Sequence, residues 1–197
     1  NPPFGTVKDE NGNIVKWDNP YNPDKPLTQA DFGIMHKSLK AMKPGGMASF
    51  IVGSVAPNYN TDAARTDQYS KGNFRDFYNW LYDNYNVVAH ATIHGDLYKK
   101  RGTTYPVDMI VVHGKGKSKL KSPFFAKKAP RILANPAEVR SFINEHQAVF
   151  DNARKRAGEE RQTQPNTVEQ LARLRSLAAR PDDSGRGAAA ASADTGG

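Results

Sequence analysis

The stretch Lys43–Val52 reads KPGGMASFIV and predicts a sharp turn that leads into a buried β-strand. Proline cannot continue a helix and glycine readily adopts the left-handed conformation, so Lys43–Gly46 is a helix stop. The apolar run Met47–Val52 has the length of a strand that is buried on both faces. Because such strands occur in sheets that helices cover on both sides, the stretch predicts an α/β fold.

A helix is predicted before this turn, and a long loop before the helix. Thr28 followed by Asp31 is typical of a helix N-cap with an acidic residue in the first turn. Apolar residues then recur at helical spacing at Phe32, Met35, Leu39 and Met42. The passage Gly5–Pro26 has no periodicity and is rich in glycine, asparagine and proline. It is predicted to be a loop whose large anchors are Trp17 and Tyr21.

Two more strands are predicted downstream. A polar loop at 53–72 leads into a second helix, whose apolar positions are Phe74, Phe77, Tyr78, Leu81 and Tyr85. The apolar runs Val87–Ile93 and Val107–Val112 predict strands, and Asp108 is interpreted as a polar strand-start residue. This succession of strands and helices predicts an α/β sheet with parallel neighbouring strands.

Composition narrows the class of protein. The chain has 197 residues, enough for one domain and a tail, and its hydrophobic content of 38% is low for a compact fold of that size. It has no cysteine, which excludes disulfides and thiolate metal sites and is compatible with a reducing, cytoplasmic setting. No apolar run approaches the roughly 20 residues of a membrane span. His90 and His94 do not form a zinc pair and are interpreted as structural, so no metal is expected.

The net charge of +8 is concentrated in one segment. Residues 1–98 hold 9 basic and 10 acidic residues, residues 99–131 hold 10 and 1, and residues 132–197 hold 9 and 9, so the net charges are −1, +9 and 0. A solvated loop is one interpretation of a charge run. So local an excess on an otherwise neutral chain favours contact with a polyanion.

The basic segment continues beyond the last predicted strand. Residues 115–134 are predicted to form a flexible linker strip that follows nucleic-acid phosphates without reading the bases. The lysines assigned to phosphate contact are Lys115, Lys117, Lys119 and Lys121. Phe124 and Phe125 are expected to anchor the strip to the domain.

Helices and a tail are predicted to follow the strip. Asn135-Pro136-Ala137-Glu138 is a strong helix start, with a cap, a proline at the first helical position and a glutamate two residues further on. A shorter helix is predicted from Thr167, which makes 135–180 a helical segment. The composition of 181–197 predicts a disordered tail or linker.

The first four residues, Asn1-Pro2-Pro3-Phe4, combine three chemical groups in one short loop. A nucleobase amine is a poor nucleophile, so a catalyst must bind its two hydrogens with acceptors and align its nitrogen with a methyl donor. The Asn1 Oδ1 atom and the Pro2 carbonyl can supply the acceptors, and the Phe4 ring can stack on a base turned out of its helix. An ordinary turn is the alternative interpretation of the tetrapeptide alone.

The elements follow one another in the order tetrapeptide, helix ending at Lys43–Gly46, buried strand, second helix and last two strands. This order resembles that of the N6-adenine DNA methyltransferases that use S-adenosylmethionine. The similarity spans residues 1–114 and is closest to the catalytic half of the gamma class. It implies a partial Rossmann-like methyltransferase sheet and methyl transfer to adenine in DNA. It also implies that Tyr98, in the loop 95–105, closes on the flipped base. Lys99, Lys100 and Arg101 of that loop are expected to contact the nucleic-acid backbone.

The resemblance also implies a cofactor-binding half that is not recognisable in the sequence. Such enzymes bind S-adenosylmethionine with a glycine-rich loop after the first strand and an acidic residue at the end of the second. The segment Gly114-Lys115-Gly116 opens no predicted helix. The chain is therefore expected to be the downstream half of a larger polypeptide, with the cofactor half before Asn1. By analogy with large phage and plasmid proteins, a helicase-like domain could follow it.

Two other functions stay open. RNA methyltransferases that act on the N2 atom of guanine share the chemistry of the tetrapeptide. A basic, non-catalytic nucleic-acid-binding module derived from a methyltransferase fold is the alternative from a different class. The chain by itself is expected to bind S-adenosylmethionine weakly or not at all.

Overall fold

The computed structural model describes residues 4–55, 61–102, 104–152 and 155. The order of elements is α1 (Ala30–Ala41), β1 (Met47–Gly53), α2 (Asp62–Tyr69), α3 (Gly72–Asn84), β2 (Tyr85–Ile93), the 3-10 helix η1 (Gly95–Arg101), β3 (Val107–Lys115), α4 (Pro123–Ala126), β4 (Arg131–Leu133) and α5 (Pro136–Glu145). The fold is a mixed α/β one, as the sequence predicts. The helix predicted from Thr167 and the predicted tail 181–197 lie outside the described residues.

The four strands form one sheet in the order β1-β3-β2-β4. Strand β3 is antiparallel to both β1 and β2, and β4 is parallel to β2. The prediction of parallel neighbours is therefore wrong for the three long strands. The reason is that η1 connects β2 to β3 without a crossover, so β3 returns beside β2 and takes the place between β2 and β1. Strands β1 and β2 still run in the same direction, joined by α2 and α3.

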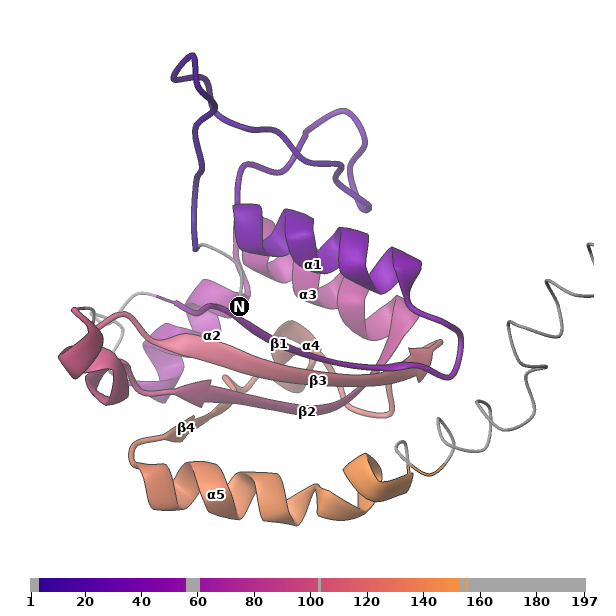
Figure 1. Cartoon of the computed structure of the whole chain (residues 1–197), viewed down its shortest axis with the longest axis vertical. Helices are drawn as coiled ribbons and strands as arrows, with labels where there is room; N and C mark the ends of the chain where they lie inside the picture. Colours follow the sequence, from indigo (N-terminus) through magenta and orange to yellow (C-terminus); the bar gives the residue numbers. More distant parts are fainter. Residues whose placement is uncertain (1–3, 56–60, 103, 153–154, 156–197) are drawn as a thin grey trace, which may run out of the picture. The chain divides into compact units, whose positions relative to one another are not determined.

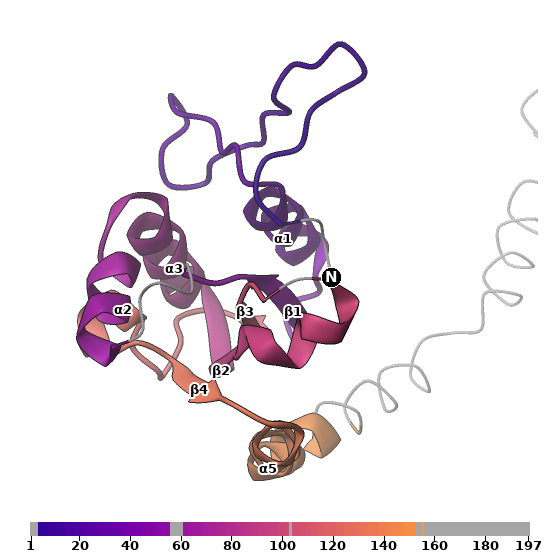
Figure 2. The same ribbon diagram turned by 90° about the vertical axis from the view of Figure 1, so that its left-hand side faces the viewer.

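Helices cover both faces of the sheet. Figures 1 and 2 show α1 and α3 on one side and α5 on the other, and each side has its own apolar cluster. The cluster under α1, α2 and α3 contains Phe32, Tyr69 and Phe77, and the cluster under α5 contains Phe142. Most of the core lies on the first side, where seven of the seventeen buried residues are aromatic.

A β-bulge in β2 changes which side chains face each cluster. The pairing of β2 with β3 shifts register on both sides of Val87. Val87 packs in the first cluster, whereas Ala89, two residues further on, packs in the second. Because an extra residue reverses the alternation of a strand, His90 and Thr92 point toward the α1–α3 side. Both side chains reach Asp108 of β3 there.

The start of α1 differs from the prediction. Its N-cap is Gln29, which makes no side-chain capping hydrogen bond, and not Thr28. Asp31 is only 3% exposed, and its side chain accepts a hydrogen bond from the Gly53 N–H at the end of β1. The end of the helix agrees with the prediction, since α1 stops at Ala41, just before the Lys43–Gly46 turn.

One helix lies in the segment predicted to be a loop at 53–72. Helix α2 begins after Thr61, whose side chain accepts a hydrogen bond from the Ala64 N–H. Its buried residues are Arg65 and Tyr69, one turn apart. A helix with only two inward side chains shows no apolar stripe in its sequence, which is why periodicity did not reveal it.

The segment 5–29 leaves the domain and returns, as Figure 1 shows above α1. Isolated antiparallel bridges join Thr6 to Gln29 and Trp17 to Leu27, and a third, between Lys8 and Ile14, closes a local turn. The Trp17 ring lies directly on Gly33 of α1, where a Cβ atom would come within 2.2 Å of its Cγ atom. The predicted anchoring by Trp17 is thus confirmed, and it requires a glycine in the helix.

The basic segment 115–134 is hydrogen-bonded to the rest of the domain. The Gly116 and Ser118 N–H groups donate to the carbonyls of Asn84 and Tyr82. The segment also contains α4 and β4, and β4 pairs with β2. All of the described residues belong to a single compact unit.

Helix α5 begins as the sequence predicts. The Asn135 side chain accepts a hydrogen bond from the Glu138 N–H at 3.0 Å, and Glu138 accepts in return from the Ala134 N–H at 2.8 Å. None of the helices in the described residues combines the length and apolar character needed to cross a lipid bilayer. The described residues also contain no cluster of three or more histidine and carboxylate side chains that could hold a metal ion.

Candidate functional site

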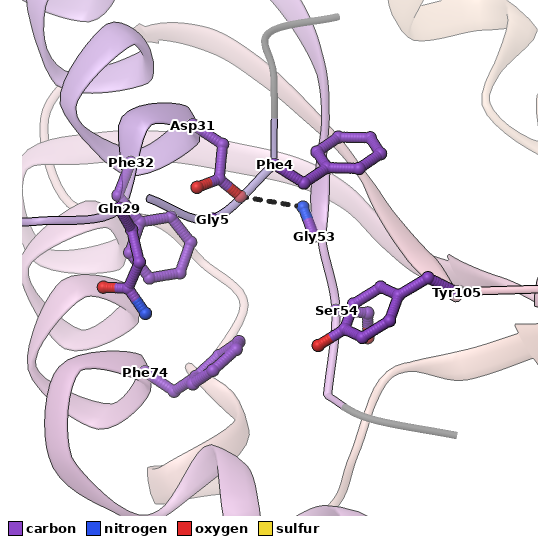
Figure 3. A pocket seen from close by; sticks show the side chains of 9 residues that line it. All are labelled: Phe4, Gly5, Gln29, Asp31, Phe32, Gly53, Ser54, Phe74 and Tyr105. Atoms are coloured by element: carbon purple, nitrogen blue, oxygen red, sulfur yellow. Dashed lines mark hydrogen bonds between the residues drawn. The ribbon is translucent and has the colours of Figure 1, made fainter. Parts of the chain in front are cut away.

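A cavity of about 440 Å³ opens where β1 ends. Its described lining residues are Phe4, Gly5, Gln29, Asp31, Phe32, Gly53, Ser54, Phe74 and Tyr105. Figure 3 shows Gln29, Phe32 and Phe74 on the helix side, and Phe4, Ser54 and Tyr105 on the strand side. Ligands of open α/β sheets bind beyond the carboxyl ends of strands, and this volume is typical of a small-molecule site.

The aromatic wall on the helix side is held rigidly. The Phe32 ring stacks on Phe77 with centroids 4.1 Å apart, and the Phe74 ring meets Phe32 edge-on at 5.5 Å. Phe32 and Phe77 are almost fully buried. Phe74 is half-buried and is therefore the ring of this wall that a ligand can reach, held in place by the buried rings behind it.

Asp31 joins α1 to the end of β1 at the cavity. Its Oδ2 atom accepts a hydrogen bond of 2.9 Å from the Gly53 N–H, and Figure 3 shows the carboxylate between α1 and the Phe4 segment. A Cβ atom on Gly53 would lie 3.3 Å from this oxygen and 3.6 Å from the Phe4 Cβ atom. Glycine at this position therefore permits the close approach of both residues.

The Asp31 carboxyl group has an unusual environment. Burial raises its pKa above the ordinary value, while nearby backbone N–H groups, first that of Gly53, act in the opposite direction. Within the described part of the chain, its Oδ1 atom is buried and has no hydrogen-bond partner. The cavity wall thus contains an acceptor that the fold itself does not use.

The N-terminal segment reaches the cavity through backbone contacts with α1. The Ala30 N–H donates to the Gly5 carbonyl at 2.7 Å, and Thr6 pairs with Gln29. These bonds place Phe4 beside Gly53. Phe4 is 40% exposed, so its ring stands at the rim of the cavity.

Tyr105 reaches the same rim from the connection between η1 and β3, and it is also 40% exposed. The start of η1 determines where this connection runs. A Cβ atom on Gly95 would come within 1.7 Å of the Thr104 carbonyl oxygen. Only glycine permits this approach of two backbone segments, so Gly95 positions the residues next to Tyr105.

Ser54 connects the cavity to a buried polar network. Its Oγ atom lies 2.7 Å from the Tyr69 hydroxyl, and Tyr69 in turn donates to the Asp108 carboxylate at 2.7 and 2.8 Å. Tyr78 and Thr92 also donate to Asp108, at 2.7 and 2.8 Å. Arg65 extends the network, since its guanidinium donates to Thr92 Oγ1 at 2.9 Å and to the Pro130 carbonyl at 2.8 Å.

Asp108 lies at the start of β3, as the sequence predicts, and it is fully buried at the centre of this network. Burial raises the pKa of Asp108, but His90 and the two tyrosine hydroxyls outweigh this effect and hold it below the ordinary value. The Nε2 atom of His90 lies 3.4 Å from the carboxylate. Asp108 is therefore an ionised acceptor in the core.

Of the residues predicted to bind the base, only Phe4 is found at the cavity. Asn1 and Pro2 lie outside the described residues. Tyr98 packs against the apolar cluster under α5 and is not one of the described lining residues. Tyr105, which comes later in the same loop, lines the cavity together with Phe4. Its position seven residues later in the same loop is the only sequence signal that could have indicated it.

The predicted phosphate-binding residues fall into two groups. Lys99 and Lys100 are exposed on η1, which follows the carboxyl end of β2. The second group is exposed at and beyond the other end of β3 and consists of Lys115, Lys117, Lys119 and Lys121. The two ends of this nine-residue strand are about 26 Å apart. Lys117 also pairs with Asp83 at 3.0 Å. The side chain of Arg101 is outside what the structure describes.

Comparison of the chain with protein-family models, with curated proteins and with solved structures finds no match. The fold and the cavity are thus the basis for any functional assignment.

Proposed function

We propose that this chain is the base-binding half of an S-adenosylmethionine-dependent N6-adenine DNA methyltransferase. The observation that carries the proposal is the position of Phe4, the last residue of the Asn-Pro-Pro-Phe stretch, at the rim of an aromatic-walled cavity beside Tyr105. An enzyme that acts on a base outside the duplex needs such a cavity. The volume of about 440 Å³ is sufficient for one nucleobase.

The chemistry required of the chain is to bind and orient an amino group. In the proposal the Asn1 Oδ1 atom and the Pro2 carbonyl accept its two hydrogens, and Phe4 stacks on the ring. Two prolines restrict the loop and remove N–H groups that would compete for the acceptors. The bond of Ala30 to the Gly5 carbonyl supports this role, because it ties the loop to α1 immediately after Phe4.

The sheet supports a Rossmann-like assignment. Strands β1 and β2 run in the same direction and are linked through helices, as the strands of doubly wound α/β sheets are. We propose that these strands, with β3 reversed between β1 and β2, form the later part of a methyltransferase sheet. The earlier strands of that sheet belong to another segment. The cavity lies beyond the carboxyl end of β1, where that class of sheet binds ligands.

The described residues do not fit S-adenosylmethionine. Such a cofactor binds at a glycine-rich turn between a strand and a helix, and no turn of this kind follows a strand in the described part of the chain. Gly95 follows β2, but its place is filled by the Thr104 carbonyl. We therefore derive no step for the cofactor, and the proposal assigns its binding to an upstream half of the same polypeptide.

The proposal is tested by methyl transfer with the gene product that contains this chain. Labelled S-adenosylmethionine is incubated with unmethylated DNA and separately with ribosomal RNA, and the products are digested to nucleosides. The expected product is N6-methyladenine in DNA, with Asn1→Ala abolishing it. N2-methylguanine in RNA would establish the alternative enzyme, and DNA binding with no methyl transfer to either substrate would establish a non-catalytic module.

A further inference from the structure

We propose that Phe125, Lys127 and Lys128, which lie in and just after α4, form a second nucleic-acid surface that binds an unpaired strand. A base stacks on the Phe125 ring, and the two lysines contact the neighbouring phosphates. This α4 surface goes beyond the proposed function, because none of its three residues is among the described residues that line the cavity. The exposure of Phe125, the charges around it and the backbone of Lys127 support the proposal.

The two phenylalanines of α4 differ in their exposure. Phe124 is half-buried and can anchor the segment, as the sequence predicts. Phe125 is 57% exposed, more than any other large apolar side chain in the described residues. Its ring meets the Phe124 ring edge-on, with centroids 5.0 Å apart. A ring that is held by a neighbour and open to solvent is free to stack on a planar ligand.

The segment that carries Phe125 is fixed on both sides of α4. Before the helix, the Ser122 hydroxyl donates a hydrogen bond to the Asn79 side chain of α3. After it, the Ala129 N–H donates to the Thr66 hydroxyl of α2 at 2.9 Å. Because the ring stands on a fixed turn, little conformational entropy is lost when a ligand binds there.

The surroundings of Phe125 are positively charged. Residues 109–131 contain seven basic residues and no acidic one. Helices α2 and α3, which pack against α4, carry four aspartates, and each of these forms an ion pair with a lysine or an arginine. Among the described residues, Lys128 has no ion-pair partner that would neutralise it. An excess of positive charge at one place favours a polyanion as the ligand.

Lys127 has a backbone conformation that is unusual for a lysine. Its φ of 52° lies in the left-handed region, and no other residue except glycine has a positive φ in the part of the chain that the structure describes. Glycine or asparagine is usual at this position after a helix, because other side chains are strained there. In this conformation the Lys127 Nζ atom lies over the Phe124 ring, 4.3 Å from its centroid. Backbone strain of this kind is concentrated at functional sites, and here it places a cation beside two aromatic rings.

A flat ring among lysines fits an unpaired strand better than a duplex. The faces of bases in a duplex are covered by their neighbours, whereas an unpaired base can lie on an aromatic ring while its phosphates contact cations. A lipid surface is a poorer fit, because it requires a wider apolar area. The large apolar side chains exposed in 115–131 are Leu120 and Phe125, and α4 has only four residues.

The experiment compares two oligomers that have the same charge. One is a fluorescently labelled oligothymidylate of about 10 nucleotides, and the other is an abasic strand of the same length. Fluorescence anisotropy measures their binding to the 197-residue chain at several salt concentrations. Because stacking needs a base, the oligothymidylate should bind at least about fivefold more tightly than the abasic strand.

The variants separate stacking from charge. Phe125→Ala should weaken the binding of oligothymidylate about fivefold or more and leave the abasic strand unaffected, whereas Phe125→Trp should keep the preference. Lys127→Ala with Lys128→Ala should weaken both oligomers and lower the slope of log affinity against log salt by about 1.4. Ile143→Ala on α5 is the matched control, because it also truncates an exposed apolar side chain, and it should bind both oligomers as the unmodified chain does.

Unchanged binding of oligothymidylate by Phe125→Ala would overturn the proposal. An equal loss for the abasic strand in this variant would do so too, since the ring would then not act by stacking. Co-sedimentation with phosphatidylserine vesicles that depends on Phe125, without a preference for oligothymidylate, would assign the α4 surface to lipid instead. None of these measurements involves methyl transfer or S-adenosylmethionine, so this proposal and the proposed function fail independently.

Discussion

Asp31 at the start of α1 accepts a 2.9 Å hydrogen bond from the backbone N–H of Gly53 at the end of β1. This bond brings together the helix and the strand on either side of the Lys43–Gly46 turn, and the cavity opens beside it. A carboxyl group at this position is both a structural link and an unused acceptor, so it is a sensitive point for experiment.

The Asp31→Asn variant should change how stability depends on pH. Burial raises the pKa of Asp31 above its ordinary value of 3.8, so just above that pH the folded protein holds a proton that the unfolded chain has lost. The free energy of unfolding contributed by this group therefore falls as pH rises from about 4 toward 7. The variant keeps an oxygen that can accept from Gly53, but its stability should not fall over this pH range. Urea unfolding at several pH values measures the free energy of unfolding of both proteins, and parallel pH profiles would contradict the prediction.

The Asp108→Asn variant should show the opposite pH effect. The pKa of Asp108 is lowered despite its burial, because His90 and the tyrosine hydroxyls favour the ionised form. Its stabilisation is therefore present above pH 3.8 and is lost as the pH falls through the folded-state pKa. The variant should lose about 1.5–3 kcal/mol at neutral pH, the usual contribution of a hydrogen bond to a charged group, and less than that in acid. The same urea series tests it, and a constant difference at all pH values would refute it.

The Gly95→Ala variant should displace the segment that carries Tyr105. The added Cβ atom would come within 1.7 Å of the Thr104 carbonyl oxygen, which is backbone and cannot rotate away. We expect a loss of roughly 1–3 kcal/mol in stability from overpacking, with amide NMR shifts concentrated in residues 94–107. Thr104→Ala is the control, because it alters an exposed side chain and leaves the carbonyl in place. Equal behaviour of the two variants would show that this contact does not position the loop.

The two groups of lysines should differ in DNA binding. Each phosphate contact that is lost lowers the slope of log affinity against log salt by about 0.9. On a duplex of about 8 base pairs, Lys99→Ala with Lys100→Ala should lower the slope by about 2, whereas Lys119→Ala with Lys121→Ala should have no effect. On a duplex longer than about 20 base pairs, both double variants should lower it, because about 26 Å separates the two groups. Fluorescence anisotropy at several salt concentrations measures the slope for each double variant. If both double variants lower the slope equally on the short duplex, the DNA does not centre on the cavity.

The sequence predicted helices and strands correctly where a residue type has a single effect on local structure. The glycines and proline of Lys43–Gly46 end α1, the apolar run after them forms β1, and Asn135 with Glu138 starts α5. Helix α2 was missed because its two inward residues, Arg65 and Tyr69, leave no apolar stripe. Thr28 matched a capping pattern, but Asp31 forms its bond with a residue 22 positions away.

The amino-acid sequence by itself determined a mixed α/β fold, the position of most helices and strands, and the tetrapeptide on which the methyltransferase proposal rests. Only the tertiary structure decided that β3 lies between β1 and β2, that Tyr105 and not Tyr98 stands beside Phe4, and that Ser54 is linked to Asp108 through Tyr69. The reason is that periodicity reports which side of its own element a residue occupies. It does not report which residue of another element lies opposite, and Phe4, Ser54, Tyr69, Tyr105 and Asp108 come from five different segments.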